Sequence, residues 1–184
     1  EDMPFDTQTG FIETWKFLVN RYKNHTNFIG IDIINEPWIV KGMCTPKELK
    51  LNEFYTKVGK AVRAIDKDLL LIYEDSQDFP DYDLAVSRPL ELPNSIYSFH
   101  LYTGNWDPDG YKRTNRFVIR ARDWDVPLFI GEFDMLGYAW NDPNNYATKD
   151  WQRQGDAMFS YFKKNDVNWA FWAYSGYHSL LKSP

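Results

Sequence analysis

Cysteine is almost absent from this sequence. The single residue Cys44 excludes an internal disulfide and any zinc site built from cysteines. No stretch approaches the roughly 18 consecutive apolar residues of a membrane-spanning helix, so we expect no membrane span. Basic residues are also in deficit, because 21 Lys and Arg stand against 26 Asp and Glu, a formal charge of −5. Nucleic-acid binding requires a basic surface, and we therefore expect no nucleic-acid partner.

Aromatic residues are abundant: the chain contains 8 Trp, 12 Tyr and 13 Phe. A hydrophobic core uses part of this content, and a surplus of Trp and Tyr also suits a groove that stacks flat ligands. Hydrophobic residues make up 43% and charged residues 26% of the sequence, which indicates a folded, core-forming protein. A length of 184 residues fits one domain, and we treat residues 1–184 as a single unit.

The N-terminal residues carry no targeting signal. Residues 1–6 are mostly acidic and polar, without the basic start and apolar stretch of a signal peptide. The chain does not begin with Met, so we expect a processed or excised piece of a longer chain. The residues themselves leave the compartment open.

Apolar runs of strand length alternate with helical patterns along the chain. The five expected strands are Phe28–Ile34, Leu69–Tyr73, Ile96–Tyr102, Leu128–Phe133 and Val167–Tyr174. Because several runs are continuously apolar, they indicate strands of a parallel sheet that is covered on both faces. Amphipathic helices are expected over Phe11–Lys23, Arg113–Trp124 and Asp150–Lys164.

Two connecting segments, residues 45–65 and 75–94, have sequence patterns of their own. The capping box Thr45-Pro46-Lys47-Glu48 predicts a helix that begins there and continues through Ile65. The segment Asp75–Asn94 contains three prolines and only a hint of helix around Asp83–Ser87. We expect a mostly irregular crossover in this second segment.

Repeated alternation of strands and helices predicts an α/β fold with a parallel sheet and right-handed crossovers. An open doubly wound sheet and a barrel both satisfy this order. No Gly-x-Gly-x-x-Gly motif follows any strand, which removes the usual nucleotide-binding case for the open sheet. Polar and aromatic residues gather at the C-terminal ends of four strands, as in a (β/α)8 barrel. A complete barrel has eight strands, so five strands predict part of a barrel.

Two glutamates each follow or close a strand. Glu36 lies in Asn35-Glu36-Pro37-Trp38, and Glu132 lies in Gly131-Glu132-Phe133-Asp134. Either one alone could simply cap a helix or pair with an arginine. Together they can face each other only across a shared sheet or barrel mouth, where two carboxylates suit glycoside hydrolysis. That chemistry requires an acid with a raised pKa and an ionised nucleophile, and we expect the carboxyl groups to lie about 5–5.5 Å apart.

Two further groups of residues could support such a site. His100 and Tyr102 are two positions apart in a strand and share one face, from which they could bond a carboxylate or a sugar. Trp172 lies near the end of the last strand, where an indole could stack on a sugar ring. Plain core packing is the alternative for both groups.

The chain resembles glycoside hydrolase family 5, the cellulase-like family of retaining enzymes. The likeness rests on Ile33-Ile34-Asn35-Glu36-Pro37, His100-x-Tyr102, Phe129-Ile130-Gly131-Glu132-Phe133 and Trp172. These motifs are similar to the family's signatures of strands four, six, seven and eight, in the same order. The resemblance implies the C-terminal part of a (β/α)8 barrel, here called a TIM barrel, in which the first three strands are absent.

The resemblance also implies a role for each site residue. Glu36 would be the general acid/base and Glu132 the nucleophile. Asn35 would contact the sugar 2-hydroxyl, and Trp172 would stack on the sugar beside the cleaved bond. His100 and Tyr102 would support the nucleophile and the bound sugar. We expect neither a cofactor nor a metal.

The implied function is that of a retaining endo-β-glycosidase, most of all an endo-β-1,4-glucanase acting on a β-linked oligo- or polysaccharide. Two alternatives stay open: a barrel fragment that binds sugar without turning it over, and a relative that cleaves mannan or glycolipid glycans. The missing strands would also expose strand edges. We therefore expect a complementary N-terminal barrel segment, a second copy of the chain, or an exchange of elements between copies. The family resemblance points to secretion.

Overall fold

The computed structural model describes residues 7–37, 50–75, 84–101, 111–133 and 151–172 of the chain. Its described strands are β1 (Gly30–Asp32), β2 (Leu70–Glu74), β3 (Ser95–Leu101), β4 (Leu128–Phe133) and β5 (Asn168–Phe171). Its described helices are α1 (Thr7–Tyr22), α3 (Leu51–Arg63), α4 (Tyr111–Asp123) and α5 (Trp151–Lys164). The order of elements is the order that the sequence predicts.

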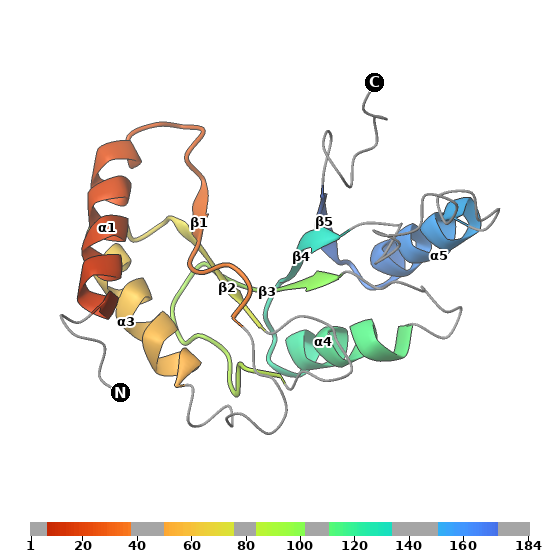
Figure 1. Cartoon of the computed structure of the whole chain (residues 1–184). Coiled ribbons are helices and arrows are strands. Elements are labelled where there is room, and N and C mark those ends of the chain that lie inside the picture. The colour runs from red at the N-terminus through yellow and green to blue at the C-terminus, as the bar shows by residue number, and fades with distance from the viewer. Residues whose placement is uncertain (1–6, 38–49, 76–83, 102–110, 134–150, 173–184) are drawn as a thin grey trace.

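The five strands form one parallel sheet in the order β1-β2-β3-β4-β5. Each strand lies beside the next one in the chain, and the helices lie to the outside of the strands (Figure 1). This sequential parallel order is that of a partial (β/α)8 barrel, and the expected fold class is confirmed. Among the described strands, β1 and β5 each pair on one side only.

The hydrophobic core lies between the helices and one face of the sheet. Phe99 of β3 stacks on Phe117 of α4 with ring centroids 3.9 Å apart, and Phe133 of β4 contacts Phe159 and Phe162 of α5. The largest fully buried aromatic side chains are Tyr55, Tyr73, Tyr97, Phe99, Phe117, Phe133 and Phe162. Much of the aromatic surplus therefore belongs to the layer between sheet and helices.

Several predicted boundaries are wrong. The predicted strand Phe28–Ile34 is reduced to Gly30–Asp32, and β2 extends one residue further than predicted, to Glu74. A continuous helix from Thr45 through Ile65 is excluded because Lys50 has a left-handed backbone with φ 51°. Helix α3 begins at Leu51 and ends at Arg63, while the capping box lies outside the described residues.

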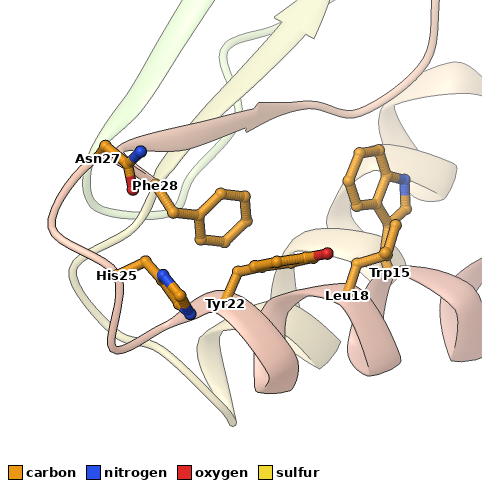
Figure 2. A pocket seen from close by; sticks show the side chains of 6 residues that line it. All are labelled: Trp15, Leu18, Tyr22, His25, Asn27 and Phe28. Atoms are coloured by element: carbon orange, nitrogen blue, oxygen red, sulfur yellow. The ribbon is translucent and has the colours of Figure 1, made fainter.

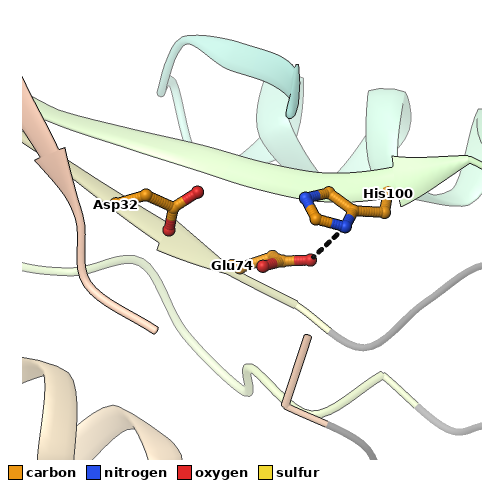
Figure 3. A group of neighbouring side chains, drawn as sticks. All are labelled: Asp32, Glu74 and His100. Carbon is orange, nitrogen blue, oxygen red and sulfur yellow. Dashed lines mark ion pairs between the residues drawn. The ribbon is translucent and has the colours of Figure 1, made fainter. Parts of the chain in front are cut away.

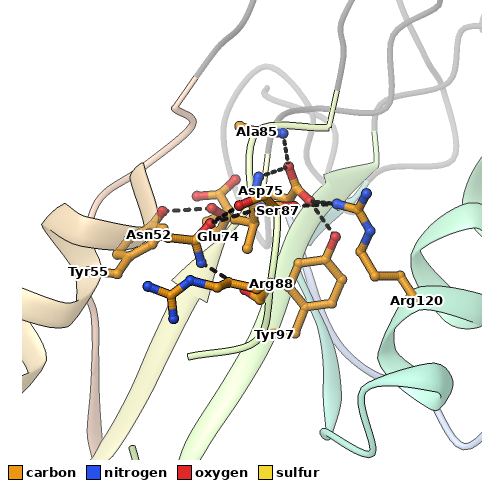
Figure 4. A network of polar contacts seen from close by, with 10 residues as sticks. Asn52, Tyr55, Glu74, Asp75, Ala85, Ser87, Arg88, Tyr97 and Arg120 are labelled. Carbon is orange, nitrogen blue, oxygen red and sulfur yellow. Dashed lines mark hydrogen bonds and ion pairs between the residues drawn. The ribbon is translucent and has the colours of Figure 1, made fainter. Parts of the chain in front are cut away.

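The crossover before β3 is irregular in its described part, residues 84–94, so the hint of helix is wrong for residues 84–87. Buried side chains hold this segment in place of regular structure (Figure 4). Asp75, fully buried, accepts hydrogen bonds from the backbone N–H groups of Ala85 and Val86. It also accepts one from the Tyr97 hydroxyl and pairs with Arg120 Nη1 at 3.1 Å.

We expect the substitution Asp75→Ala to lower the free energy of unfolding by about 3–5 kcal/mol, because it leaves the Arg120 guanidinium and several donors without their buried acceptor. Urea denaturation followed by circular dichroism measures this loss. Asp123→Ala is a matched control, since the pair between Arg122 and Asp123 is exposed and should contribute less than about 1 kcal/mol. Similar midpoints for the two variants would contradict this role of Asp75.

Candidate active site

One face of the sheet carries charged residues at the C-terminal ends of its strands. Asp32, Glu74 and His100 belong to three neighbouring strands, and Figure 3 shows their side chains directed toward one another. This face is opposite to the one that packs on the helices, because Tyr73 and Phe99, which contact Tyr55 of α3 and Phe117 of α4, alternate with Glu74 and His100. The charged residues therefore lie on the face away from the helices, at the C-terminal ends of the strands.

His100 is the centre of the site. Its imidazole is only 2% exposed, and its Nδ1 atom lies close to three carboxylates. The distances from Nδ1 are 2.9 Å to Glu36 Oε1, 3.4 Å to Glu74 Oε1 and 3.6 Å to Glu132 Oε2. One carboxylate oxygen each of Glu36 and Glu132 lie within 4.8 Å of one another. The two glutamates that the sequence singles out are therefore at the same end of the sheet, beside one histidine.

Glu36 follows β1 in a strained backbone conformation. Its φ is 48°, in the left-handed region, although it precedes Pro37 and has a full side chain. Such a conformation costs on the order of 1–3 kcal/mol and persists where the surroundings hold it. The backbone N–H of Glu36 donates a hydrogen bond of 2.8 Å to Glu74 Oε2. This bond holds the backbone of Glu36, and the contact with His100 holds its carboxylate.

Glu132 reaches the polar face through an irregularity in β4. Phe99 is paired with Ile130, but His100 is paired with Glu132, so Gly131 is an extra residue between the two pairs. Without the irregularity, strict alternation would place Glu132 on the same face as the fully buried Ile130, toward the helices. The bulge therefore turns the Glu132 side chain toward His100.

Gly131 is also required by the packing of the imidazole. A Cβ atom at this position would lie 2.9 Å from His100 Nε2 and 3.1 Å from His100 Cδ2. Both distances are shorter than the normal contacts of a Cβ atom, and the ring that such an atom would meet is itself buried. Gly131 therefore permits the close approach of the histidine of the same site.

Burial raises the pKa of two other carboxyl groups, those of Glu74 and Asp32. Desolvation, together with the negative charges of Asp32, Glu36 and Glu132, raises the pKa of Glu74 to about 9, although the hydrogen bond from the Glu36 backbone opposes the rise. Burial also raises the pKa of Asp32 to about 6, an effect that His100 opposes. Glu74 is consequently a neutral carboxylic acid at pH 7, which reduces the repulsion among the acids around His100.

The sequence also predicts Asn35, Trp172 and Tyr102 as site residues. Asn35 is exposed, three residues after the end of β1. Trp172 is half-exposed directly after β5, and its backbone N–H donates a hydrogen bond of 2.9 Å to the Phe133 carbonyl, beside Glu132. Tyr102 lies outside the described residues.

Sequence reasoning missed Asp32 and Glu74. Each interrupts or ends an apolar run, in Ile31-Asp32-Ile33 and in Ile72-Tyr73-Glu74, and a lone acid in such a run is the signal that could have found it. Two triads bring donor atoms within 4.8 Å of one another and could hold a metal ion: Asp32 with Glu74 and His100, and Glu36 with His100 and Glu132. Because both triads share His100, a cation in either one would compete with the contact between His100 and Glu36.

Solved structures of other proteins resemble this fold, among them the following two. Cel5A of Thermotoga maritima, in a complex with cellobiose, has a TM-score of 0.70 and 21% identity over 99% of this chain and 60% of its own. Endo-glycoceramidase II from Rhodococcus sp. has a TM-score of 0.68 and 17% identity over 94% of this chain and 42% of its own. Among the described helices, none combines the length and the apolar character needed to cross a membrane.

Curated relatives match by sequence as well. Cellulase CelDZ1 of Thermoanaerobacterium sp. is 22% identical over 171 residues, which are 90% of this chain and 43% of the relative. Endoglucanase Z of Dickeya dadantii is 27% identical over 162 residues, which are 88% of this chain and 34% of the relative. The chain thus spans less than half the length of these relatives. The family model for cellulase (glycosyl hydrolase family 5) matches residues 4–178, and the chain belongs to that family.

Proposed function

We propose that this chain is the part of a retaining endo-β-1,4-glucanase that carries both catalytic carboxylates. The observation that carries the proposal is the approach of Glu36 and Glu132, whose oxygens lie within 4.8 Å of one another beside His100. Retaining glycosidases have carboxyl groups about 5–5.5 Å apart, whereas inverting enzymes keep about 6.5–9.5 Å free for a water molecule. One carboxylate oxygen of each glutamate lies within 4.8 Å of the other's, which supports the retaining arrangement.

In the first step, Glu36 donates its proton to the glycosidic oxygen while a carboxylate oxygen of Glu132 bonds to the anomeric carbon. The bond between that carbon and the leaving oxygen breaks, and a glycosyl ester of Glu132 remains. In the second step, Glu36 accepts a proton from water as the water oxygen attacks the anomeric carbon. The ester bond breaks, and two inversions at the same carbon retain its configuration.

The family pattern supports this assignment of roles, and the surroundings of each glutamate fit it. His100 contacts both carboxylates, so it can orient the two groups toward one reacting bond. Asn35, exposed beside Glu36, would contact the sugar 2-hydroxyl. Trp172, half-exposed beside the end of β4, would stack on the sugar ring. Tyr102 would complete the support of the bound sugar.

The curated relatives, a cellulase and an endoglucanase, support β-1,4-glucan as the substrate. Endo-glycoceramidase II has a similar fold at 17% identity, a likeness that concerns the fold and does not favour a glycolipid. We therefore propose glucan ahead of mannan and of glycolipid glycans.

We also propose that a complementary N-terminal barrel segment completes the enzyme. Among the described strands, β1 pairs on one side only, and two apolar residues of this region are exposed: Ile29 directly before β1 by 71% and Phe17 of α1 by 64%. Between α1 and the start of β1 lies a pocket of about 420 Å³ (Figure 2). It is lined by Trp15, Leu18, Tyr22, His25, Asn27 and Phe28. Apolar side chains of an additional segment would cover this surface, at about 25 cal/mol of stabilisation per Å² of apolar area buried.

Light scattering during size-exclusion chromatography, combined with release of reducing sugar from carboxymethyl cellulose, tests both proposals. Alone, the chain should exceed its monomer mass of 21.8 kDa and release little sugar. With a separately expressed segment that supplies the first three strands, it should form a one-to-one complex and gain activity. A well-folded monomer that hydrolyses the polymer unaided would contradict the need for a complement.

A further inference from the structure

Glu74 contacts both Glu36 and His100 but has no part in the proposed reaction. It ends β2, its side chain is fully buried, and Figure 3 shows its carboxyl group between Asp32 and His100. A fully buried carboxyl group is rare, and it is retained where it serves a specific contact.

Both oxygens of this carboxyl group face the site. Glu74 Oε2 accepts the hydrogen bond of 2.8 Å from the backbone N–H of Glu36, and Glu74 Oε1 lies 3.4 Å from His100 Nδ1. The same nitrogen lies 2.9 Å from Glu36 Oε1. One oxygen of Glu74 therefore contacts the Glu36 backbone. The other lies beside the imidazole of His100, which in turn contacts the Glu36 carboxylate.

The backbone beneath Glu74 is itself anchored. The Tyr55 hydroxyl of α3 donates a hydrogen bond of 2.6 Å to the Glu74 carbonyl (Figure 4). The next N–H group, that of Asp75, donates to the Ser98 carbonyl of β3 at 2.8 Å. The end of β2 is thus held from a helix and from the neighbouring strand, so it is a rigid support for a side chain that positions another residue.

We propose that Glu74 is a positioning residue that holds Glu36 in its strained conformation and directs its carboxyl group at the glycosidic oxygen. This inference rests on the proposed role of Glu36 as the general acid/base. The left-handed φ of 48° before Pro37 needs an external partner for the N–H group, and Glu74 Oε2 is that partner. Proton transfer depends steeply on geometry, so a Glu36 that relaxes would lose acid catalysis before it loses substrate binding.

The contact requires a hydrogen-bond acceptor but no charge. Burial, with a smaller contribution from the negative charges of Glu36 and Glu132, raises the pKa of Glu74 and keeps the group neutral at pH 7. The neutral isostere Gln should therefore substitute for Glu74, whereas an apolar residue of similar volume should not.

The test compares Glu74→Leu and Glu74→Gln in the active, complete form of the enzyme. Two substrates are used, a dinitrophenyl β-cellobioside, whose leaving group needs no protonation, and carboxymethyl cellulose, whose leaving group does. We expect Glu74→Leu to lose roughly 10–100-fold in kcat on the polymer, at the lower end of a general-acid contribution, with little change in KM. Its kcat/KM on the activated substrate, which reports the first step alone, should fall by less than about 3-fold, and Glu74→Gln should restore most activity on the polymer.

Leu71→Val is the matched control, since Leu71 is equally buried on the same strand but faces the helices. It should alter both substrates equally, in proportion to the folded fraction measured by circular dichroism. Equal losses on both substrates for Glu74→Leu, or no recovery with Gln in a folded protein, would overturn the inference.

Glu36→Gln is measured in parallel. If it fails to discriminate between the substrates, the proposed function fails; if it discriminates and Glu74→Leu does not, only the positioning role fails.

Discussion

Glu132→Gln should abolish hydrolysis of every β-glucan substrate, with a loss in kcat on the order of 10⁴-fold or more, the scale expected when a nucleophile is removed. The amide nitrogen and oxygen of Gln retain the size of the side chain, but neither forms the glycosyl ester. Because the ester precedes release of the second sugar, activated and natural substrates should suffer alike. Initial rates on a dinitrophenyl cellobioside and on carboxymethyl cellulose measure the loss.

The matched control for this variant is Glu91→Gln, which makes the same chemical change at a residue whose side chain is 78% exposed. It should leave both rates within a factor of about two, since surface substitutions of this kind change stability by less than about 0.5 kcal/mol. A Glu132→Gln enzyme that is folded and still releases sugar at a tenth of the normal rate would exclude Glu132 as the nucleophile.

Glu36→Gln should separate the two classes of substrate. Loss of the proton donor should lower kcat on carboxymethyl cellulose by about 10²–10⁴-fold. A dinitrophenolate leaves without protonation, so the first step with that substrate should proceed at a nearly normal rate. The second step then lacks its general base, and the ester of Glu132 should accumulate. A burst of dinitrophenol followed by a slow steady rate is the expected result in stopped-flow measurements.

Azide provides the control for this assignment. A small anion needs no general base, so azide should accelerate the slow phase of Glu36→Gln and yield a β-glycosyl azide, with retained configuration. The same addition to Glu132→Gln should give no β-product. If Glu36→Gln loses equal activity on both substrates and does not respond to azide, Glu36 is not the acid/base.

The presence and order of the strands could be predicted from the sequence because they depend on local, continuous apolar runs. The run Leu128–Phe133 coincides with β4, and parallel order follows from alternation with helices. Boundaries were less accurate. The start of α3 depends on the left-handed backbone of Lys50, a local conformation that the capping box at Thr45–Glu48 does not predict.

The candidate site was predicted in part, and the reason is geometric. Glu36, Glu132 and His100 could be identified because each follows or closes an apolar run in a recognisable motif. The bulge at Gly131 could not, because it depends on how β4 pairs with β3, and a period of two places Glu132 on the wrong face. The partnership of Glu36 with Glu74 joins residues 38 positions apart and exists only after β1 and β2 have paired.

Covalent trapping tests the central claim, that Glu132 is the nucleophile of a retaining glycosidase, most directly. A 2-deoxy-2-fluoro-β-cellobioside with a dinitrophenolate leaving group reacts in the first step, and its fluorine slows the second, so the ester persists. After incubation with the active enzyme, intact-mass spectrometry should show one added fluorocellobiosyl group. Peptide mapping should place that group on Glu132 within Gly131-Glu132-Phe133. An adduct on Glu36, or a fully active enzyme that forms no adduct while releasing product of inverted configuration, would contradict the account.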